Sequence, residues 1–259
     1  MNFTLASILI VILLFALMTI VMEVGRRFGT KQIQKDPDGA YSGTSPIEAS
    51  IFGLLGLLVA FTISGAASRL DHRRDLIIEE TNAIGTAYLR LDLLTPVLRD
   101  RLRNCFRRYV DSRLEFYREI QNKPIAMSKL GNQSSLQDEI WNTAVEATGT
   151  PDERRDAGIL LLPALNAMFD IRTTRMGALF IHTPASVFVL LIGLALVSTF
   201  IAGYELARNS RRNWLFIVFF TGILSISVYM IIDLEYPRYG LIRISEFDQL
   251  LVDLRANMK

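Results

Sequence analysis

Four long uncharged runs stand out in the pattern of apolar and polar positions along the chain. They cover residues 3–22, 49–67, 185–204 and 214–232. About 20 apolar residues in a helix are enough to cross the hydrocarbon core of a bilayer, and a helix satisfies its backbone hydrogen bonds without water. The pattern therefore predicts an all-α, multi-pass integral membrane protein with four transmembrane helices, and the lipid bilayer is its first expected partner.

The second run continues into a charged stretch that keeps a helical pattern. No proline interrupts residues 47–94. At the start of this stretch, Ser45 suits an N-cap, Pro46 the first helical position and Glu48 the positive end of the helix. We therefore expect one continuous helix from Pro46 to Leu94, which crosses the bilayer and then extends into water as an amphipathic rod.

Residues 68–183 separate the second run from the third and carry nearly balanced charge. Apolar residues recur at helical spacing over residues 97–120, which predicts a helix there. The polar stretch 128–135 (SKLGNQSS) is expected to be a loop, followed by a short helix that ends near Ala147.

A further helix is expected to begin at the capping sequence TPDE at residues 150–153. Its apolar run, residues 157–169, is too short to span a bilayer and contains Pro163. A proline inside a helix removes a hydrogen bond and bends the chain. This segment is therefore expected to be a buried or kinked helix, not a re-entrant one.

These patterns divide the chain into four parts. A first transmembrane pair occupies residues 1–67, a helical soluble region residues 68–183, a second transmembrane pair residues 184–233, and a C-terminal tail residues 234–259. Because the loop between the third and fourth runs is short, these two helices are expected to form an antiparallel hairpin. The tail is expected to contain a short amphipathic helix.

Composition then narrows the functional classes. A net charge of +2 provides no general attraction to nucleic acid. Cys105 is the only cysteine, so neither an intrachain disulfide nor a cysteine-based metal cluster is expected. The sequence contains no phosphate-binding loop, no HExxH and no GxSxG. We therefore expect neither a cofactor nor enzymatic activity.

Small residues recur every four positions within the second run. They are Gly56, Ala60 and Ser64, and Ser68 continues the row. Such a row lets another helix approach closely. In a symmetric oligomer the same face would instead line a pore, and the sequence leaves both interpretations open.

A charged collar follows directly after this run. It consists of Arg69, Asp71, Arg73 and Arg74. In an oligomer built around the second helix, the collar would place rings of charge at a pore mouth, where they bias which ions approach. The alternative is a salt-bridged collar at the membrane boundary.

An acidic turn follows the fourth run. It contains Asp233 and Glu235, then Pro237 and Gly240. A carboxylate at the C-terminal end of a helix is electrostatically unfavourable and needs a compensating charge. Arginines of the charged collar are the simpler source, and a bound calcium or magnesium ion is the alternative, because these ions prefer oxygen ligands.

Several segments of the sequence resemble one family. The run Gly53–Ser64 (GLLGLLVAFTIS), the charged collar and the block Glu79–Tyr88 (EETNAIGTAY) are similar to the bestrophin-like family of bacterial membrane proteins, and the acidic turn fits its C-terminal pattern. The layout is more distantly similar to bestrophins, which are pentameric ion channels whose second span lines the pore. This chain differs from them in having small residues where bestrophins have a bulky apolar neck.

The resemblance implies a homo-oligomer that passes inorganic ions along the second helix. The alternative is a membrane-anchored scaffold or sensor whose helical region binds a partner, and a membrane enzyme comes third. Basic residues are equally numerous on the two sides of the spans, so the positive-inside rule does not decide the orientation. The resemblance implies a bacterial inner-membrane protein with its termini and middle region in the cytosol.

Overall fold

The computed structural model describes residues 3–36, 45–120, 123–148, 155–209 and 211–258. These residues form helices and their connections and contain no strand, so the all-α prediction is confirmed for this part of the chain. The helices are α1 (Phe3–Lys35), α2 (Ser45–Arg90), α3 (Pro96–Arg118), α4 (Lys123–Thr148), α5 (Arg155–Ala178), α6 (Ala185–Glu205), α7 (Trp214–Glu235) and α8 (Gln249–Asn257), with short 3₁₀ turns η1 (Leu91–Leu93) and η2 (Leu206–Arg208).

The chain folds as two compact units, described separately below. Unit 1 contains residues 1–70 and 182–242, and unit 2 contains residues 71–181 and 243–259. The helix α2 contributes its N-terminal part to unit 1 and its C-terminal part to unit 2. The expected unbroken helix is therefore present, and it ends at Arg90, with η1 following.

Four helices of the described chain are long and apolar enough to cross a membrane, as predicted. They are α1, α2, α6 and α7. Only 17% to 28% of the most apolar window of each helix is buried within the protein. The rest faces outward, as the apolar surface of a helix in lipid does.

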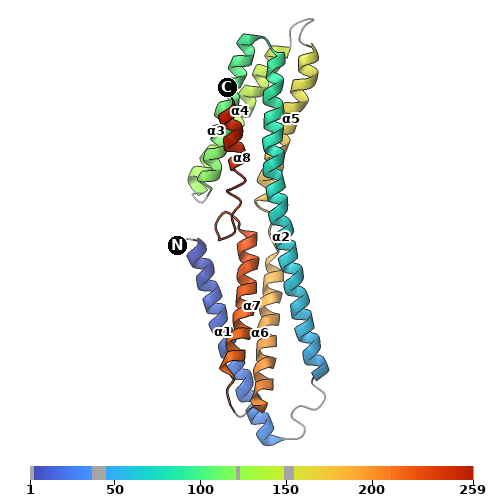
Figure 1. Ribbon diagram of the computed structural model, residues 1–259, viewed down its shortest axis with the longest axis vertical. Coiled ribbons are helices and arrows are strands. Elements are labelled where there is room, and N and C mark those ends of the chain that lie inside the picture. The colour runs from blue at the N-terminus through green and yellow to red at the C-terminus, as the bar shows by residue number, and fades with distance from the viewer. Residues whose placement is uncertain (1–2, 37–44, 121–122, 149–154, 210, 259) are drawn as a thin grey trace. The chain divides into compact units, whose positions relative to one another are not determined.

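Within unit 1, α1 packs against both α6 and α7 (Figure 1). The closest approach is between α1 and α6, where Gly25 faces the backbone of Phe200 and Gly203 faces the backbone of Met22. Any side chain at either glycine would collide with that backbone. Small residues permit such close helix contacts in membranes. The expected antiparallel hairpin of α6 and α7 is not packed as a pair: among the described residues both helices pack on α1, and α1 lies closest to α6.

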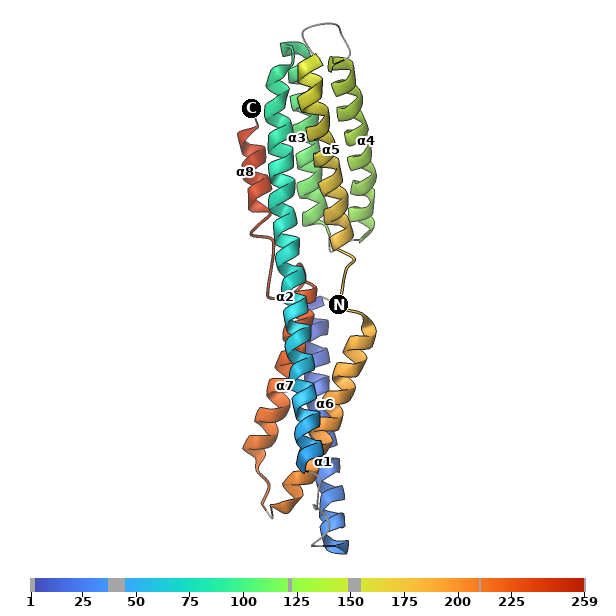
Figure 2. The same ribbon diagram turned by 90° about the vertical axis from the view of Figure 1, so that its right-hand side faces the viewer.

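Unit 2 is a helical bundle (Figure 2). It has its own apolar core. The helix α3 packs against α4 and α8, and α4 packs against α5. Each of these helices contributes buried side chains, as do the C-terminal part of α2 and the turn η1. These side chains include Ile84, Leu91, Leu102, Phe106, Tyr109, Val110, Ile140, Ala144, Leu161, Leu165, Met168 and Leu251. The expected helix in the tail is α8.

One prediction for this bundle is wrong. Residues 128–135 are not a loop, because α4 runs through them without a break. The amide of Gln133 is fully buried there, and its Nε2 donates to the carbonyl oxygen of Ser112 at 3.1 Å. Contacts with α3 thus stabilise a helix where local propensity favours a loop. The capping sequence at residues 150–153 lies outside the described residues.

Candidate functional site

The small-residue row of α2 is exposed in unit 1. Gly56, Ala60 and Ser64 are all exposed, and a side chain added at Gly56 would meet no atom within 4 Å. Leu55 and Thr62, which lie on the opposite face of this helix, are buried. Within the described part of the chain, the row is therefore not used for packing, in contrast to the small residues between α1 and α6.

Bulky apolar side chains border the exposed row. Leu54, Leu57 and Phe61 are 55%, 53% and 68% exposed. Exposed apolar surface of this extent marks a face that contacts lipid or another protein. The row of small residues and its apolar border together form a surface that the described residues of a single chain leave uncovered.

A buried carboxylate lies where α7 ends. Glu235 is 1% exposed, and its Oε1 accepts hydrogen bonds from Nε of Arg69 at 3.0 Å and from the hydroxyl of Thr183 at 2.5 Å. Nδ1 of His182 lies 3.4 Å from Oε2, and the His182 ring stacks on Tyr236. Arg69 thus supplies the compensating charge that the sequence required for this carboxylate.

The second carboxylate of the acidic turn holds the backbone instead. Oδ1 and Oδ2 of Asp233 accept the N–H groups of Leu241 and Ile242, both at 2.8 Å. Gly240 lies so close to this carboxylate that any side chain there would collide with it. Asp233 therefore fixes the turn after α7. Among the described residues, no group of three or more His, Cys, Asp or Glu side chains is placed to hold a metal ion.

The remaining collar residues, which belong to unit 2, also have partners. Arg73 is 5% exposed and donates to the carbonyl oxygens of Ala178 at 3.2 Å and Ile181 at 2.8 Å, where α5 ends. Arg74 pairs with the exposed Asp71 at 3.0 Å. These contacts agree better with a salt-bridged collar than with a ring of unpaired charges. A role of the collar at a pore mouth stays a prediction.

Unit 2 contains a buried charge cluster that the sequence analysis did not identify. Glu80 and Arg113 are fully buried, and Nε of Arg113 donates to Oε1 of Glu80 at 2.7 Å. Arg175 bonds the other oxygen of Glu80 and pairs with Asp248 at 2.9 Å. The cluster joins α2, α3, α5 and the segment before α8. Gln133 of α4 completes it by accepting from Arg113 at 3.0 Å.

A signal for this cluster was present in the sequence. Arg113 follows Phe106 and Tyr109 at helical spacing and so lies within the apolar stripe of α3. Glu80 holds the same kind of position between Ile77 and Ile84 in α2. A charge inside an apolar stripe indicates a buried ion pair, because an isolated buried charge is too unfavourable to persist.

The cluster and its surroundings shift several pKa values. Burial alone would lower the pKa of Arg113, but Tyr117 and Glu80 outweigh burial, and the pKa is raised above its ordinary value. Burial also raises the pKa of Tyr109, whose hydroxyl has no hydrogen-bond partner in the described structure. At the edge of the core, burial and the carboxylate of Glu139 raise the pKa of the Cys105 thiol to about 11.

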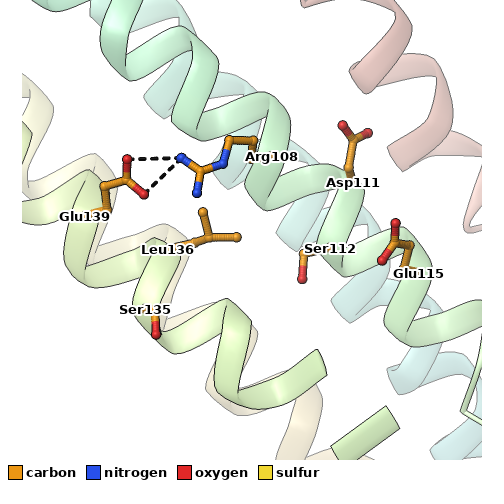
Figure 3. Close-up of a pocket in the computed structure, with 7 residues that line it drawn as sticks. All are labelled: Arg108, Asp111, Ser112, Glu115, Ser135, Leu136 and Glu139. Atoms are coloured by element: carbon orange, nitrogen blue, oxygen red, sulfur yellow. Dashed lines mark hydrogen bonds and ion pairs between the residues drawn. The ribbon is translucent and has the colours of Figure 1, made fainter. Parts of the chain in front are cut away.

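A pocket of about 380 Å³ lies between α3 and α4 in unit 2 (Figure 3). Arg108 spans it and donates to both carboxylate oxygens of Glu139 at 3.0 Å. Asp111 at its rim pairs with Arg255 at 2.8 Å. The hydroxyl of Ser112 is buried on its wall without a partner in the described structure. This pocket is a recess that unit 2 offers to a partner.

Comparison with known proteins identifies a family. The model of the bestrophin-like domain matches residues 12–247, which include α2, the acidic turn, and Glu80, Arg113 and Arg175 of the charge cluster. No curated protein and no solved structure matches the chain. The match covers most of the chain and agrees with the four apolar helices. The chain is therefore an integral membrane protein and belongs to the bestrophin-like family.

Proposed function

We propose that the chain assembles with copies of itself into an ion channel whose pore is lined by α2. The observation that carries the proposal is the exposure of Gly56, Ala60 and Ser64 on the face of α2 opposite its packed side. Small and polar residues bury little apolar surface when they face lipid. They allow close packing when they face another helix, and they can line the path of ions when they face a water-filled pore. Because the face points away from its own unit, a wet path along it requires further subunits.

The collar completes the proposed conduction path. Asp71 follows Ser64 by seven residues and so lies on nearly the same face of α2. Its side chain is 67% exposed, whereas Arg69 and Arg73 are held by contacts within the chain. Asp71 and Arg74, which pair with each other at 3.0 Å, are therefore the collar residues most available to passing ions.

The alternative function is a membrane-anchored module that binds a partner through unit 2. The α3–α4 pocket favours it, because the pocket combines a buried, unpartnered hydroxyl of Ser112 with the charged side chains of Arg108 and Glu139. A partner with both a cationic and an anionic group would suit this lining. The two functions predict different results from the same purified protein.

The test is ion flux into liposomes that contain the purified oligomer, preceded by a native mass measurement of its subunit number. Ser64→Trp should reduce flux by roughly tenfold, because an indole at a pore wall blocks a narrow path. Val189→Trp is the matched control, since Val189 of α6 is 71% exposed on unit 1 and outside α2. A monomer, or equal flux in the two variants, would contradict the channel.

We also infer that unit 2 and both termini face the cytosol of a bacterium and that the loops before α2 and before α7 face outward. Single cysteines at Lys31 and Asp253 test this inference in cells. Both positions are exposed, and the native Cys105 is buried and contributes little background. A membrane-impermeant maleimide should label Lys31→Cys and not Asp253→Cys, and the opposite result would reverse the orientation.

A further inference from the structure

A second cavity lies in unit 1, away from α2 and its exposed face. It has a volume of about 140 Å³ and is formed where α1 leaves its apolar run, where η2 follows α6 and where α7 begins. Met22 and Ile217 provide apolar lining, and Trp214 stands beside them. Segments far apart in the sequence, from α1 and from the region between α6 and α7, thus line one recess at the polar ends of candidate spans.

The cavity carries excess positive charge. Three guanidinium groups line it, those of Arg26, Arg27 and Arg212, against the single carboxylate of Glu23. Glu23 accepts from Arg27 at 3.1 Å and from Arg212 at 3.0 Å. The guanidinium of Arg26 has no side-chain partner among the described residues, although it is half-buried. One carboxylate therefore serves two arginines, and a third is left for an anion from outside.

The position of the cavity indicates the source of that anion. Arg26 lies four residues after the end of the first apolar run, and Trp214 opens the fourth run. Tryptophan and arginine are typical of the level where a bilayer passes from hydrocarbon to headgroups. Ile20 and Leu215 are 61% and 68% exposed, which leaves apolar surface next to the recess for an acyl chain. The Arg212 guanidinium also lies over the Trp214 ring, 5.7 Å from its centroid, which fixes its direction.

We propose that this cavity binds the phosphate group of an anionic phospholipid. Arg26 and Arg212 donate to the phosphate oxygens, because the planar guanidinium matches phosphate in a two-pronged contact. Glu23 orients Arg212, and Trp214 packs against the glycerol and upper acyl region. Basic pockets between transmembrane helices are suited to acidic headgroups. The proposal is independent of ion conduction, since none of these residues belongs to α2.

The experiment is native mass spectrometry of the delipidated, full-length protein titrated with phosphatidylglycerol. Replacing both arginines, Arg26→Gln with Arg212→Gln, should weaken binding by roughly tenfold. The matched control is Lys31→Gln with Arg211→Gln, which removes the same charge from the same two segments at positions that do not line the cavity. The control should stay within about twofold of the unchanged protein.

Two further titrations identify the ligand. Phosphatidylcholine carries the same phosphate with a compensating ammonium group and should bind more weakly than phosphatidylglycerol. Inorganic phosphate should not compete at equal concentration, because it lacks the acyl chains. Equal losses in the two double variants would show diffuse attraction and overturn the proposal, as would equal binding of phosphatidylcholine or saturation by inorganic phosphate. If the double variant does not fold, Arg26→Gln alone serves, since Arg26 has no partner in the described chain to lose.

Discussion

Neutralising the fully buried Glu80 should strongly destabilise unit 2. Glu80→Gln removes the charge that both Arg113 and Arg175 contact. Arg175 keeps Asp248, but Arg113 is fully buried and would be left with the neutral Gln133 and Tyr117. Removing one partner of a buried ion pair costs about 3–5 kcal/mol. With about 2–4 °C of melting temperature per kcal/mol in a protein of this size, a loss of roughly 10 °C is expected.

The assay is thermal unfolding of the full-length protein in detergent, followed by the fluorescence of Trp141. This residue packs against the core of unit 2 and the ring of Phe169. A Trp214→Phe background removes the only other tryptophan. The control is Glu79→Gln, which is the same change one position earlier on the exposed side of α2. A melting temperature of Glu80→Gln within about 2 °C of the control would refute the reasoning.

Three further predictions concern backbone contacts and the single thiol. Gly203→Val should lower the melting temperature of unit 1, because the side chain would collide with α1, while Gly193→Val on the same helix meets no atom within 4 Å and should leave it unchanged. Alkylation of Cys105, measured by mass spectrometry, should be roughly a hundredfold slower at pH 8 than for a thiol of ordinary pKa 9.0, since its pKa is raised to about 11 and the thiolate appears only as the pH approaches that value. Gly240→Ala should displace the Asp233 carboxylate and expose the following turn to limited proteolysis, and unchanged cleavage would contradict this.

The membrane helices were predictable because their signal is local. An uncharged run of 19 or 20 residues admits few structures other than a helix in lipid. The continuity of α2 was equally local, since it required only a good start at Ser45-Pro46 and no breaker before Leu94. In both cases the residues that determine the structure are the ones that adopt it.

The path of α4 was not predictable in this way. Residues 128–135 combine serine, asparagine and glycine, which favour loops when they are exposed. The helix persists there because Gln133 reaches Ser112 and Arg113, which lie about twenty positions earlier in the chain. Local propensity carries no information about such a contact, and tertiary packing overrides it.

For the small-residue face of α2, the sequence predicted only two alternatives, helix packing and pore lining. Gly25 and Gly29 of α1 have the same four-residue spacing as Gly56 and Ala60 of α2. One pair touches the backbone of a neighbouring helix and the other meets open space. The spacing shows that close approach is sterically permitted, but the neighbour that approaches depends on how all four helices assemble.

The shared helix α2 determines how this protein can be divided. A domain inserted into a host usually leaves and re-enters through loops, so it can be cut out and expressed alone. Here the first junction, between Leu70 and Asp71, falls inside a helix. Cutting there would strip backbone donors and acceptors of their partners on both sides of the break. Recombination at this junction would meet the same obstacle, so the membrane helices and the helical bundle are not separable at that point.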